Sequence, residues 1–428
     1  MQKFYISCLL KELGIDKNSK KKRNSNNTYE CIEEKNEEDI VKIHKEYMNK
    51  HDIPLLSDQE SLPFLYWIPK MHKNPTKQRY IAASHCCSTK PLSKMITFCL
   101  KLIQRTHTNY CYKFAKNRGF NRMWIVDNSV EILKKIEQCN KKTVRNIRTY
   151  DFSTLYTSIP HKDLKKRIEK IIDQCFNKSN RRYISIGKTQ ANWNITRSKN
   201  NPSWTKTETV EHINYLIDNI YVMCGDSLFK QVIGIPMGTD CAPFLANLFL
   251  YSYECEWLCK KFEEKQVDIL QRFNYCFRYI DDLLCINNDQ MMETFMTEIY
   301  PKELGLTSDN SVLQSNYLDL DLEIRNGKIN TSLFDKRDAF KFKIVNFPDL
   351  SGNIPEKQSY GVFISQLIRY ARCCEDFKDF KERTHTLIDR LKSQNFKMIQ
   401  LKRTFEKFAE THYELLFKYK IKVCTACL

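Results

Sequence analysis

The stretch Arg278-Tyr279-Ile280-Asp281-Asp282-Leu283-Leu284 places two adjacent carboxylates inside an otherwise apolar run. A second apolar run follows from Leu283 to Ile286. Upstream, aromatic side chains alternate with other residues at the two-residue period of a strand: Phe273, Tyr275, Phe277 and Tyr279. We therefore predict a β-hairpin with Asp281 and Asp282 at its tip.

The acidic pair Asp281 and Asp282 has two possible interpretations, a metal site and a solvated turn. Neighbouring carboxylates repel each other unless a cation neutralises them, and hard oxygen ligands of this kind suit Mg²⁺. A solvated acidic turn is the alternative, and so short a motif does not decide between the two. The decision rests on the rest of the chain.

A third carboxylate lies in Arg148-Thr149-Tyr150-Asp151-Phe152-Ser153-Thr154-Leu155-Tyr156, a short strand-like run. Pro160 then opens a predicted helix. Apolar residues recur in this helix at helical spacing: Leu164, Ile168, Ile171, Ile172 and Cys175. A strand that turns into a helix after Asp151 can aim that carboxylate at the Asp281–Asp282 tip. An ordinary core strand is the alternative.

The segment Gly234-Ile235-Pro236-Met237-Gly238-Thr239-Asp240-Cys241-Ala242-Pro243 precedes an apolar helix over Phe244–Tyr253. Glycine and proline at these positions allow the backbone to approach a ligand closely before the helix starts. The alternative is an edge loop leading into a buried helix. We also predict helices around Pro91–Asn109 and over Ser129–Cys139.

Taken in order, these segments resemble motifs A, B and C of a reverse transcriptase palm. Leu62–Lys73 and Arg79–Ser84 resemble the finger motifs of Penelope-like retroelement reverse transcriptases. Further stretches are similar to that family: Pro91–Lys94, Tyr317–Leu320, Gly327, Asp335–Arg337 and Ser365–Arg369. The resemblance covers roughly residues 28 to 420, and several ordered motifs are more specific than any single one.

The resemblance implies an α+β fold, a right-hand polymerase with fingers, an antiparallel-sheet palm and a helical thumb. It divides the chain into a polar N-terminal extension (1–60), fingers and palm (61–335) and a helical thumb-like region (336–428). Asp319 and Leu320 are expected in the primer-grip region.

The activity implied by the resemblance is RNA-directed DNA polymerisation. Asp151, Asp281 and Asp282 are the expected catalytic and metal-binding residues, and they would hold two Mg²⁺ ions, with Mn²⁺ as a substitute. The expected partners are an RNA template, a DNA primer, the RNA–DNA hybrid and deoxynucleoside triphosphates (dNTPs). Four basic residues of the predicted C-terminal helices are candidates for contact with the hybrid backbone, or ordinary solvent charges: Arg369, Arg372, Lys402 and Arg403.

We expect three basic residues to contact the triphosphate of the incoming nucleotide: Lys70, Lys73 and Arg79. Arg79 is suited to a bidentate grip, whereas the two lysines are equally compatible with surface charges.

Tyr156 lies where the family places the residue that faces the sugar, so its ring would exclude a 2′-hydroxyl and favour deoxynucleotides; a packed core tyrosine is the alternative. Met237 and Gly238 complete the expected nucleotide-binding set. Many retroviral-type enzymes have Gln at the position of Met237, and the Penelope-like group shares the Met.

Composition agrees with a protein that holds a polyanion. The 428 residues carry a formal net charge of +18, and 42% of them are hydrophobic, as in a globular chain.

The 18 cysteines follow no disulfide framework and no secretory signal precedes them, which indicates an intracellular protein with reduced thiols. Lys20–Arg23 is a candidate nuclear import signal or a solvated loop, so the nucleus or the cytoplasm is expected. No segment has the apolar length that a bilayer requires.

Two regions depart from the family pattern or are not explained by it. The Lys/Arg/Asn-rich insert Asn177–Lys206, with Trp193 and Trp204, is expected to form a long exposed loop or hairpin. Many relatives carry a GIY-YIG endonuclease after the polymerase, and the residues after Lys420 offer none, so we expect primer extension without nicking of duplex DNA. Cys424 and Cys427 near the C-terminus have the spacing of half a zinc site, but no second Cys or His pair follows them, so we expect no structural metal there.

Two alternatives remain. One is another reverse transcriptase lineage, such as a telomerase-related, retron or intron-encoded enzyme, but the finger and C-terminal motifs favour the Penelope-like group. The other is a domesticated or decayed element that only binds nucleic acid. A protein that only binds nucleic acid gains nothing from three clustered carboxylates next to a polyanion. The presence of all three aspartates therefore favours an active enzyme.

Overall fold

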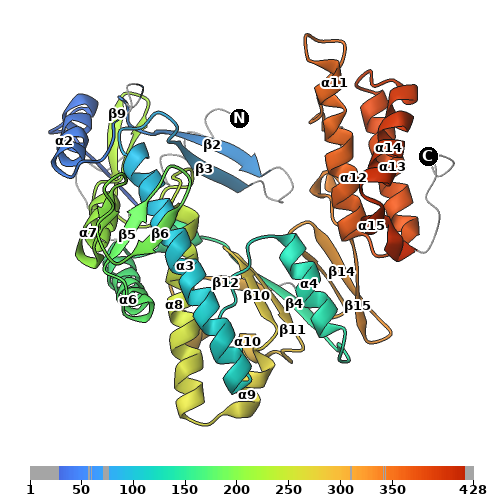
Figure 1. The fold of residues 1–428 in the computed structure, drawn as a ribbon, viewed down its shortest axis with the longest axis horizontal. Coiled ribbons are helices and arrows are strands. Elements are labelled where there is room, and N and C mark those ends of the chain that lie inside the picture. Colours follow the sequence, from blue (N-terminus) through green and yellow to red (C-terminus); the bar gives the residue numbers. More distant parts are fainter. Residues whose placement is uncertain are drawn as a thin grey trace, which may run out of the picture. The chain divides into compact units, whose positions relative to one another are not determined.

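The computed structural model describes residues 28–55, 58, 60–70, 77–308, 311–340, 342 and 344–419 (Figure 1). The chain divides into two compact units. Unit 1 comprises the described residues up to Ile125 together with Asp151–Asn274 and Gln290–Thr307; unit 2 comprises Val126–Tyr150, Tyr275–Asp289 and the described residues from Ser308 onward. Both units mix helices with mainly antiparallel sheets. Among the described helices, none combines the length and the apolar character needed to span a bilayer.

Unit 1 contains a five-stranded sheet with the strand order β1-β9-β8-β2-β3. Its neighbours pair antiparallel except β2 and β8, which are parallel. Helix α2 (Glu37–Lys50) begins at a capping box formed by Asn36 and Asp39, and its Ile40 packs with Leu62 and Leu228. The strands are β1 (Tyr29–Cys31), β2 (Phe64–Lys70), β3 (Lys77–Ala83), β8 (Tyr221–Cys224) and β9 (Ser227–Gln231).

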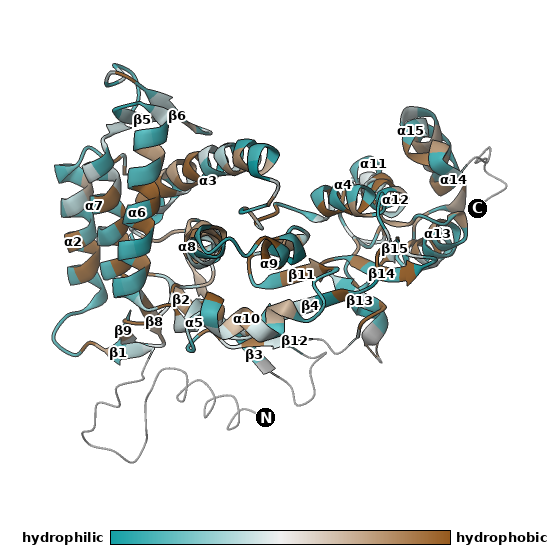
Figure 2. Ribbon diagram, turned by 90° about the horizontal axis from the view of Figure 1, so that it is seen from below, coloured by the Kyte–Doolittle hydropathy of each residue, from teal (hydrophilic) through white to brown (hydrophobic). Residues whose placement is uncertain are grey.

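The helices of unit 1 pack against one another through apolar faces (Figure 2). Helix α6 (His161–Ser179) buries the predicted stripe from Leu164 to Cys175, which confirms the helical periodicity. Helix α8 (Ala242–Glu263) buries residues on several sides, as expected for a helix in the middle of a unit. The remaining helices are α3 (Lys90–Arg118), α5 (Leu155–Ser158), α7 (Lys206–Asp218), α9 (Val267–Arg272) and α10 (Met291–Ile299).

The expectation of an exposed loop or hairpin over Asn177–Lys206 is only partly right. The segment forms a hairpin of β5 (Tyr183–Ile186) and β6 (Ala191–Asn194), and β7 (Ser203–Trp204) completes a three-stranded sheet. Trp204 is only 4% exposed, and Trp193 Nε1 donates to Thr106 Oγ1 of α3 over 2.9 Å. Ile184, Ile186 and Ala191 are buried as well, although Ile195 is exposed, while the charged side chains face water, so the insert is largely a packed part of the unit.

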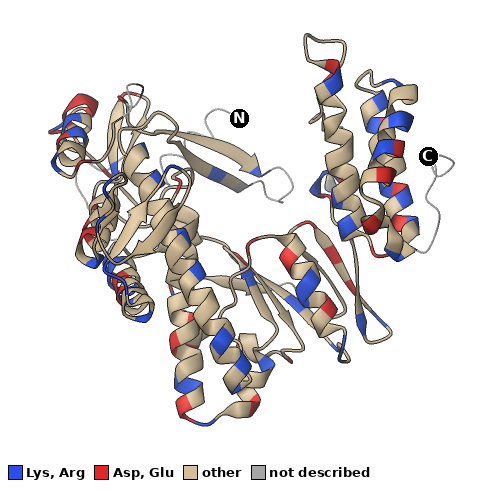
Figure 3. Cartoon of the chain, in the orientation of Figure 1, with Lys and Arg blue, Asp and Glu red and all other residues tan. Residues whose placement is uncertain are grey.

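Unit 2 contains α4 (Ser129–Cys139), which has the predicted bounds, and most of a four-stranded sheet of order β10-β11-β4-β12. A second sheet, β13-β14-β15, packs through Tyr317 and Leu322 with Phe363 and Leu367 of α12. Lys and Arg alternate with Asp and Glu along α13 and α14 (Figure 3). The strands are β4 (Ile147–Phe152), β10 (Cys276–Tyr279), β11 (Asp282–Ile286), β12 (Leu306–Ser308), β13 (Gln314–Tyr317), β14 (Leu320–Arg325) and β15 (Lys328–Leu333). The helices are the 3-10 turns η1 (Lys336–Ala339) and η2 (Phe417–Tyr419), and α11 (Glu356–Ser359), α12 (Gly361–Cys373), α13 (Phe377–Lys392), α14 (Met398–Thr411) and α15 (Tyr413–Leu416).

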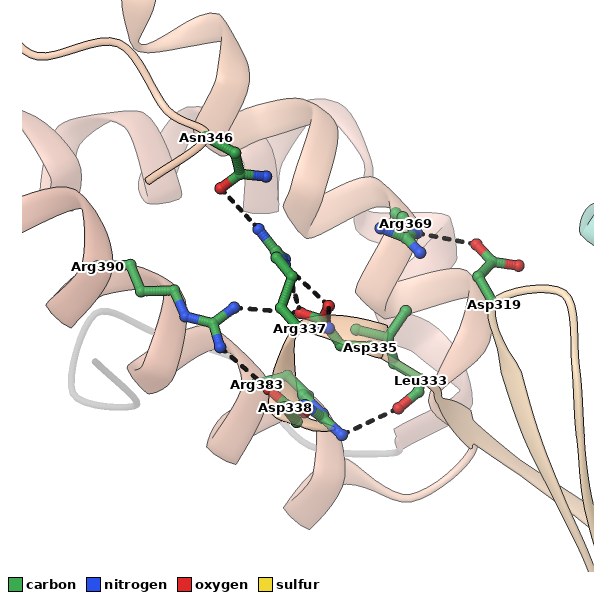
Figure 4. Close-up of polar contacts among 9 residues, drawn as sticks. All are labelled: Asp319, Leu333, Asp335, Arg337, Asp338, Asn346, Arg369, Arg383 and Arg390. Atoms are coloured by element: carbon green, nitrogen blue, oxygen red, sulfur yellow. Dashed lines mark hydrogen bonds and ion pairs between the residues drawn. The ribbon is translucent and has the colours of Figure 1, made fainter. Parts of the chain in front are cut away.

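Arginines and aspartates tie these helices to the sheet (Figure 4). Asp335, just after β15, accepts from Arg337 Nη2 over 2.6 Å and from Arg390 Nη1 of α13 over 3.1 Å. Arg390 also reaches Asp338, and Arg383 donates to that carboxylate and to the carbonyl of Leu333. Burial alone would raise the pKa of Asp335, but the hydrogen bonds and charge of Arg337, with Arg390, lower it below its usual value. The network therefore fixes α13 against the end of β15.

Candidate active site

The predicted hairpin is confirmed, with the two acidic residues at its tip. Strands β10 and β11 pair antiparallel, and Tyr279 opposite Asp282 is the last pair. Ile280 and Asp281 are thus the two residues of the turn. Both acidic residues are half-buried. The turn presents two successive carboxylates at one end of the hairpin.

The backbone of this turn is strained. Ile280 has φ of 54°, a left-handed conformation that a β-branched side chain rarely adopts. The β8–β9 turn, Gly225-Asp226, has the same arrangement with a glycine (φ 59°) in the first position. Such strain costs on the order of 1–3 kcal/mol and persists where surrounding contacts impose it.

Two residues of unit 2 impose the turn conformation. Arg278, whose side chain is fully buried, donates from Nη1 to the carbonyl oxygen of Ile280 over 3.0 Å. The Tyr317 hydroxyl of β13 lies 3.1 Å from the carbonyl oxygen of Phe277 and 3.3 Å from that of Asp282, so it bridges both strands. Burial, and then the charge of Asp282, raise the pKa of Tyr317 well above its usual value, which keeps the hydroxyl a donor.

Asp151 lies on β4, which neighbours β11 in the sheet order β10-β11-β4-β12. Tyr150 and Phe152 are buried and Asp151 is exposed, so its side chain leaves the strand on the opposite side from theirs. Asp151 belongs to unit 1, whereas Asp281 and Asp282 belong to unit 2. Within the described parts of the chain, no group of three or more His, Cys, Asp or Glu side chains is arranged to hold a metal ion. A shared metal site of the three aspartates therefore stays a prediction.

The segment around Tyr156 and the glycine loop at 234–238 lie side by side in unit 1. The N–H of Ile235 donates to the carbonyl of Tyr156 over 2.8 Å, and the N–H of Gly234 donates to that of Ile159 over 2.8 Å. Gly234 has φ of 83°, and a Cβ there would lie 2.2 Å from the Tyr156 carbonyl oxygen. Only glycine fits this close approach, as the sequence suggested for the loop.

The same loop also contacts β3. The N–H of Ala82 donates to the carbonyl of Met237 over 2.8 Å, and Ser84 Oγ donates to the carbonyl of Gly238. Gly238 has φ of 117°, and a Cβ there would lie 2.1 Å from the Ala82 carbonyl oxygen and 3.4 Å from Ile81 Cγ2. The loop thus bridges Tyr156 and the β2–β3 hairpin.

Lys70 and Arg79 lie on that hairpin. Ile68 opposes Arg79 and Lys70 opposes Lys77, so Lys70 and Arg79 share one face of the sheet with Ile81. This face also exposes apolar side chains, Phe64 at 50% and Ile68 at 46%. Lys73 lies outside the described residues, as do Lys20–Arg23 and Cys424 and Cys427.

Asp319, expected in the primer-grip region, has an arginine partner that the sequence pattern does not predict. Leu318 and Asp319 form the two-residue turn between β13 and β14, and Arg369 Nε of α12 donates to Asp319 Oδ2 over 2.8 Å. Arg372 is exposed, as are Lys402 and Arg403 on α14. The roles of Arg278 and Tyr317 were missed as well. The available signal for Arg278 was a charged residue between two aromatic positions, Phe277 and Tyr279, of an otherwise apolar strand.

No family model matches this sequence, and a search of curated proteins finds no relative. Among solved structures, telomerase from Candida albicans in complex with a TWJ fragment of telomeric RNA aligns with a TM-score of 0.56 and 14% identity, over 89% of this chain and 64% of that one. Apo telomerase from Candida tropicalis aligns with a TM-score of 0.43 and 13% identity, over 88% and 67% of the two chains. An RNA polymerase complex of a double-stranded RNA virus aligns with a TM-score of 0.43 and 9% identity, over 79% and 27%. The chain spans 64% of the length of the Candida albicans telomerase and has a similar fold.

Proposed function

We propose that this chain is an RNA-directed DNA polymerase, a reverse transcriptase of a Penelope-like retroelement. The proposal is supported by the order of its motifs along the sequence and by the fold that it shares with a telomerase. One observation carries it: the Ile280-Asp281 turn presents two carboxylates on a strained backbone that Arg278 and Tyr317 hold in place. Strain maintained in this way is typical of functional sites.

Asp151, Asp281 and Asp282 would hold two Mg²⁺ ions, or Mn²⁺ in their place. Their donor atoms are hard carboxylate oxygens, which these cations prefer, and the strands that carry Asp151 and Asp282 are neighbours in the sheet order. When bound, such ions lower the pKa of a primer 3′-hydroxyl and neutralise charge on the attacking and leaving oxygens. The task of Arg278 and Tyr317 is to keep the two hairpin carboxylates together despite their repulsion.

The nucleotide would bind beside the loop at 234–238. The loop contacts the Tyr156 backbone and β3. From there the Tyr156 ring would face the sugar and Arg79 would grip the triphosphate. Met237 and Gly238 would contact the base pair, and Lys70 and Lys73 would add charge at the phosphates. A ring beside C2′ leaves no room for a hydroxyl, so DNA is the expected product.

In this assignment β2 and β3 belong to the fingers, the β10-β11-β4-β12 sheet to the palm and α12–α14 to the thumb. The proposed partners are an RNA template, a DNA primer and the hybrid that they form. The exposed Arg372, Lys402 and Arg403 would meet phosphates of the hybrid, which proteins recognise by shape and backbone. A retroelement enzyme of this kind would act in the nucleus, where integration takes place, or in the cytoplasm.

A primer-extension assay tests the proposal. Purified protein is incubated with a DNA primer annealed to an RNA template, dNTPs and Mg²⁺, with and without a chelator, and binding to the same hybrid is measured in parallel. The proposal expects extension that depends on Mg²⁺. Tight binding without extension by Mg²⁺ or Mn²⁺ would contradict it and support a protein that only binds nucleic acid.

A further inference from the structure

Arg122 is a buried cation whose neighbours are aromatic rings and thiols. The residue is 7% exposed and follows α3 in the chain. Its guanidinium lies 3.5 Å from the centroid of the Phe114 ring. In the described part of the chain, no carboxylate lies within ion-pair distance of it. A buried charge without a counter-charge costs several kcal/mol, so an anion is needed here.

The closest candidate for that anion is a cysteine. Arg122 Nη1 donates to Cys259 Sγ over 3.2 Å, while Arg122 Nε is buried without a hydrogen-bond partner. Cys255 lies one turn earlier on α8, and Cys111 of α3 has its Sγ 3.2 Å from Tyr251 Oη. The guanidinium thus has a thiol where arginines usually have a carboxylate.

The electrostatic surroundings distinguish the three thiols. The hydrogen bond from Cys255, and then the hydrogen bond and charge of Arg122, lower the pKa of Cys259 to about 6 against the effect of burial. The charge of Glu263, on the same helix, acts weakly in the opposite direction. The hydrogen bond with Cys259 and burial raise the pKa of Cys255 well above its usual value, and burial raises that of Cys111.

We propose that Cys259 is a modification site, where a thiolate held by Arg122 attacks small soft electrophiles such as peroxides. Cys259 is partly exposed, which admits a small reagent. The sulfur attacks one peroxide oxygen, an S–O bond forms and the O–O bond breaks. The leaving hydroxide takes a proton from solvent and becomes water. The thiolate is oxidised to a sulfenic acid and the peroxide is reduced. This inference does not depend on the proposed polymerase activity.

The product is a sulfenic acid or an adduct with an external group, because Cys255 is poorly placed to form a disulfide. Residues four apart on a helix have Cβ atoms about 5–6 Å apart, whereas a disulfide needs about 3.5–4.5 Å. A neutral adduct leaves Arg122 buried without its anion. Modification is therefore expected to lower the stability of unit 1, in which α8 directly follows the loop at 234–238.

Alkylation across a pH series tests the reactivity. The reduced full-length protein is pulsed with iodoacetamide between about pH 5 and pH 10, and each cysteine is followed by peptide mass spectrometry. Cys224, which is also partly exposed but has its pKa raised by burial, is the matched control. We expect the Cys259 rate to be half-maximal near pH 6 and, at pH 7, at least about tenfold above that of Cys224. Equal rates at pH 7, or Cys255 as the fast thiol, would overturn the proposal.

Two substitutions separate the role of Arg122 from that of folding. Arg122→Gln should move the Cys259 profile toward higher pH, because the hydrogen bond and charge of the guanidinium are lost while the hydrogen bond from Cys255 remains; Arg122→Lys keeps a cation and should retain most of the shift. Circular dichroism checks that each variant folds; should Arg122→Gln fail to fold, the wild type and Arg122→Lys still give the comparison with Cys224. An unchanged profile in folded Arg122→Gln would refute the assignment. After hydrogen peroxide, dimedone should label Cys259, and labelling of other cysteines alone would refute it too.

Discussion

The hydroxyl of Tyr317 lies 3.3 Å from the carbonyl oxygen of Asp282 and 3.1 Å from that of Phe277, so one side chain of β13 bridges both strands of the acidic hairpin. Tyr317→Phe removes this bridge without changing volume. We expect unfolding to become easier by about 1–3 kcal/mol, since a buried hydrogen bond is lost, and primer extension to slow about tenfold. Chemical denaturation and single-turnover extension measure the two effects.

Tyr419→Phe is the matched control for that substitution. Its hydroxyl is also buried and donates to the carbonyl of Cys374 over 2.8 Å, far along the chain from the hairpin. The control should lose comparable stability and keep its extension rate. Equal slowing of both variants would mean that Tyr317 contributes only stability.

Gly234→Ala should destabilise the protein more than Gly225→Ala. Both glycines have positive φ, so both substitutions strain the backbone by about 1–2 kcal/mol. At Gly225 nothing lies within 4 Å of the new Cβ, but at Gly234 the Tyr156 carbonyl oxygen is 2.2 Å away and must shift. Denaturant titration should show a difference of at least about 2 kcal/mol between the two variants. Equal losses would show that the loop can move away from Tyr156.

Tyr156→Ala should admit ribonucleotides while leaving the acidic hairpin intact, because it removes a steric wall and not a charge. The measurement is the ratio of incorporation efficiencies for a ribonucleotide and its deoxy counterpart. Tyr156→Phe keeps the ring and should keep the ratio of the wild type. A ratio that is the same in all three proteins would assign Tyr156 to packing.

Asp335→Asn should cost stability at neutral pH but little in acid. The arginines lower the pKa of Asp335, so its contribution is present above the unfolded carboxyl pKa of about 3.9 and is lost as the pH falls toward the lower folded value. We expect a loss of about 2–4 kcal/mol at pH 7 that shrinks below about pH 4. Asp321→Asn should show a smaller loss, because this carboxylate accepts from Gln314 and, among the described residues, forms no ion pair with an arginine. A loss that does not change with pH would exclude the charge of Asp335 as its cause.

The sequence was most predictive where local patterns determine structure. The alternation of aromatic residues up to Tyr279 and the apolar run after Asp282 predicted the hairpin. The helical spacing of apolar residues from Leu164 to Cys175 predicted α6. Glycine at position 234 predicted a close backbone approach but not its partner, Tyr156. The contacts of Tyr317 and Arg278 depend on tertiary packing, which no local pattern encodes. The insert after Asn177 was misjudged in part because its many charges obscured the apolar residues that bury it against α3.

The most direct test of the proposed catalytic role of Asp281 compares Asp281→Asn with Asp226→Asn in Mg²⁺-dependent primer extension on an RNA template. Both aspartates are the second residue of a two-residue turn whose first residue has positive φ, so the substitutions are made on the same backbone arrangement. We predict that Asp281→Asn loses roughly 4 kcal/mol of transition-state stabilisation, about a thousandfold in rate, and that Asp226→Asn extends like the wild type. Equal rates for the two variants would contradict the assignment of Asp281 to catalysis.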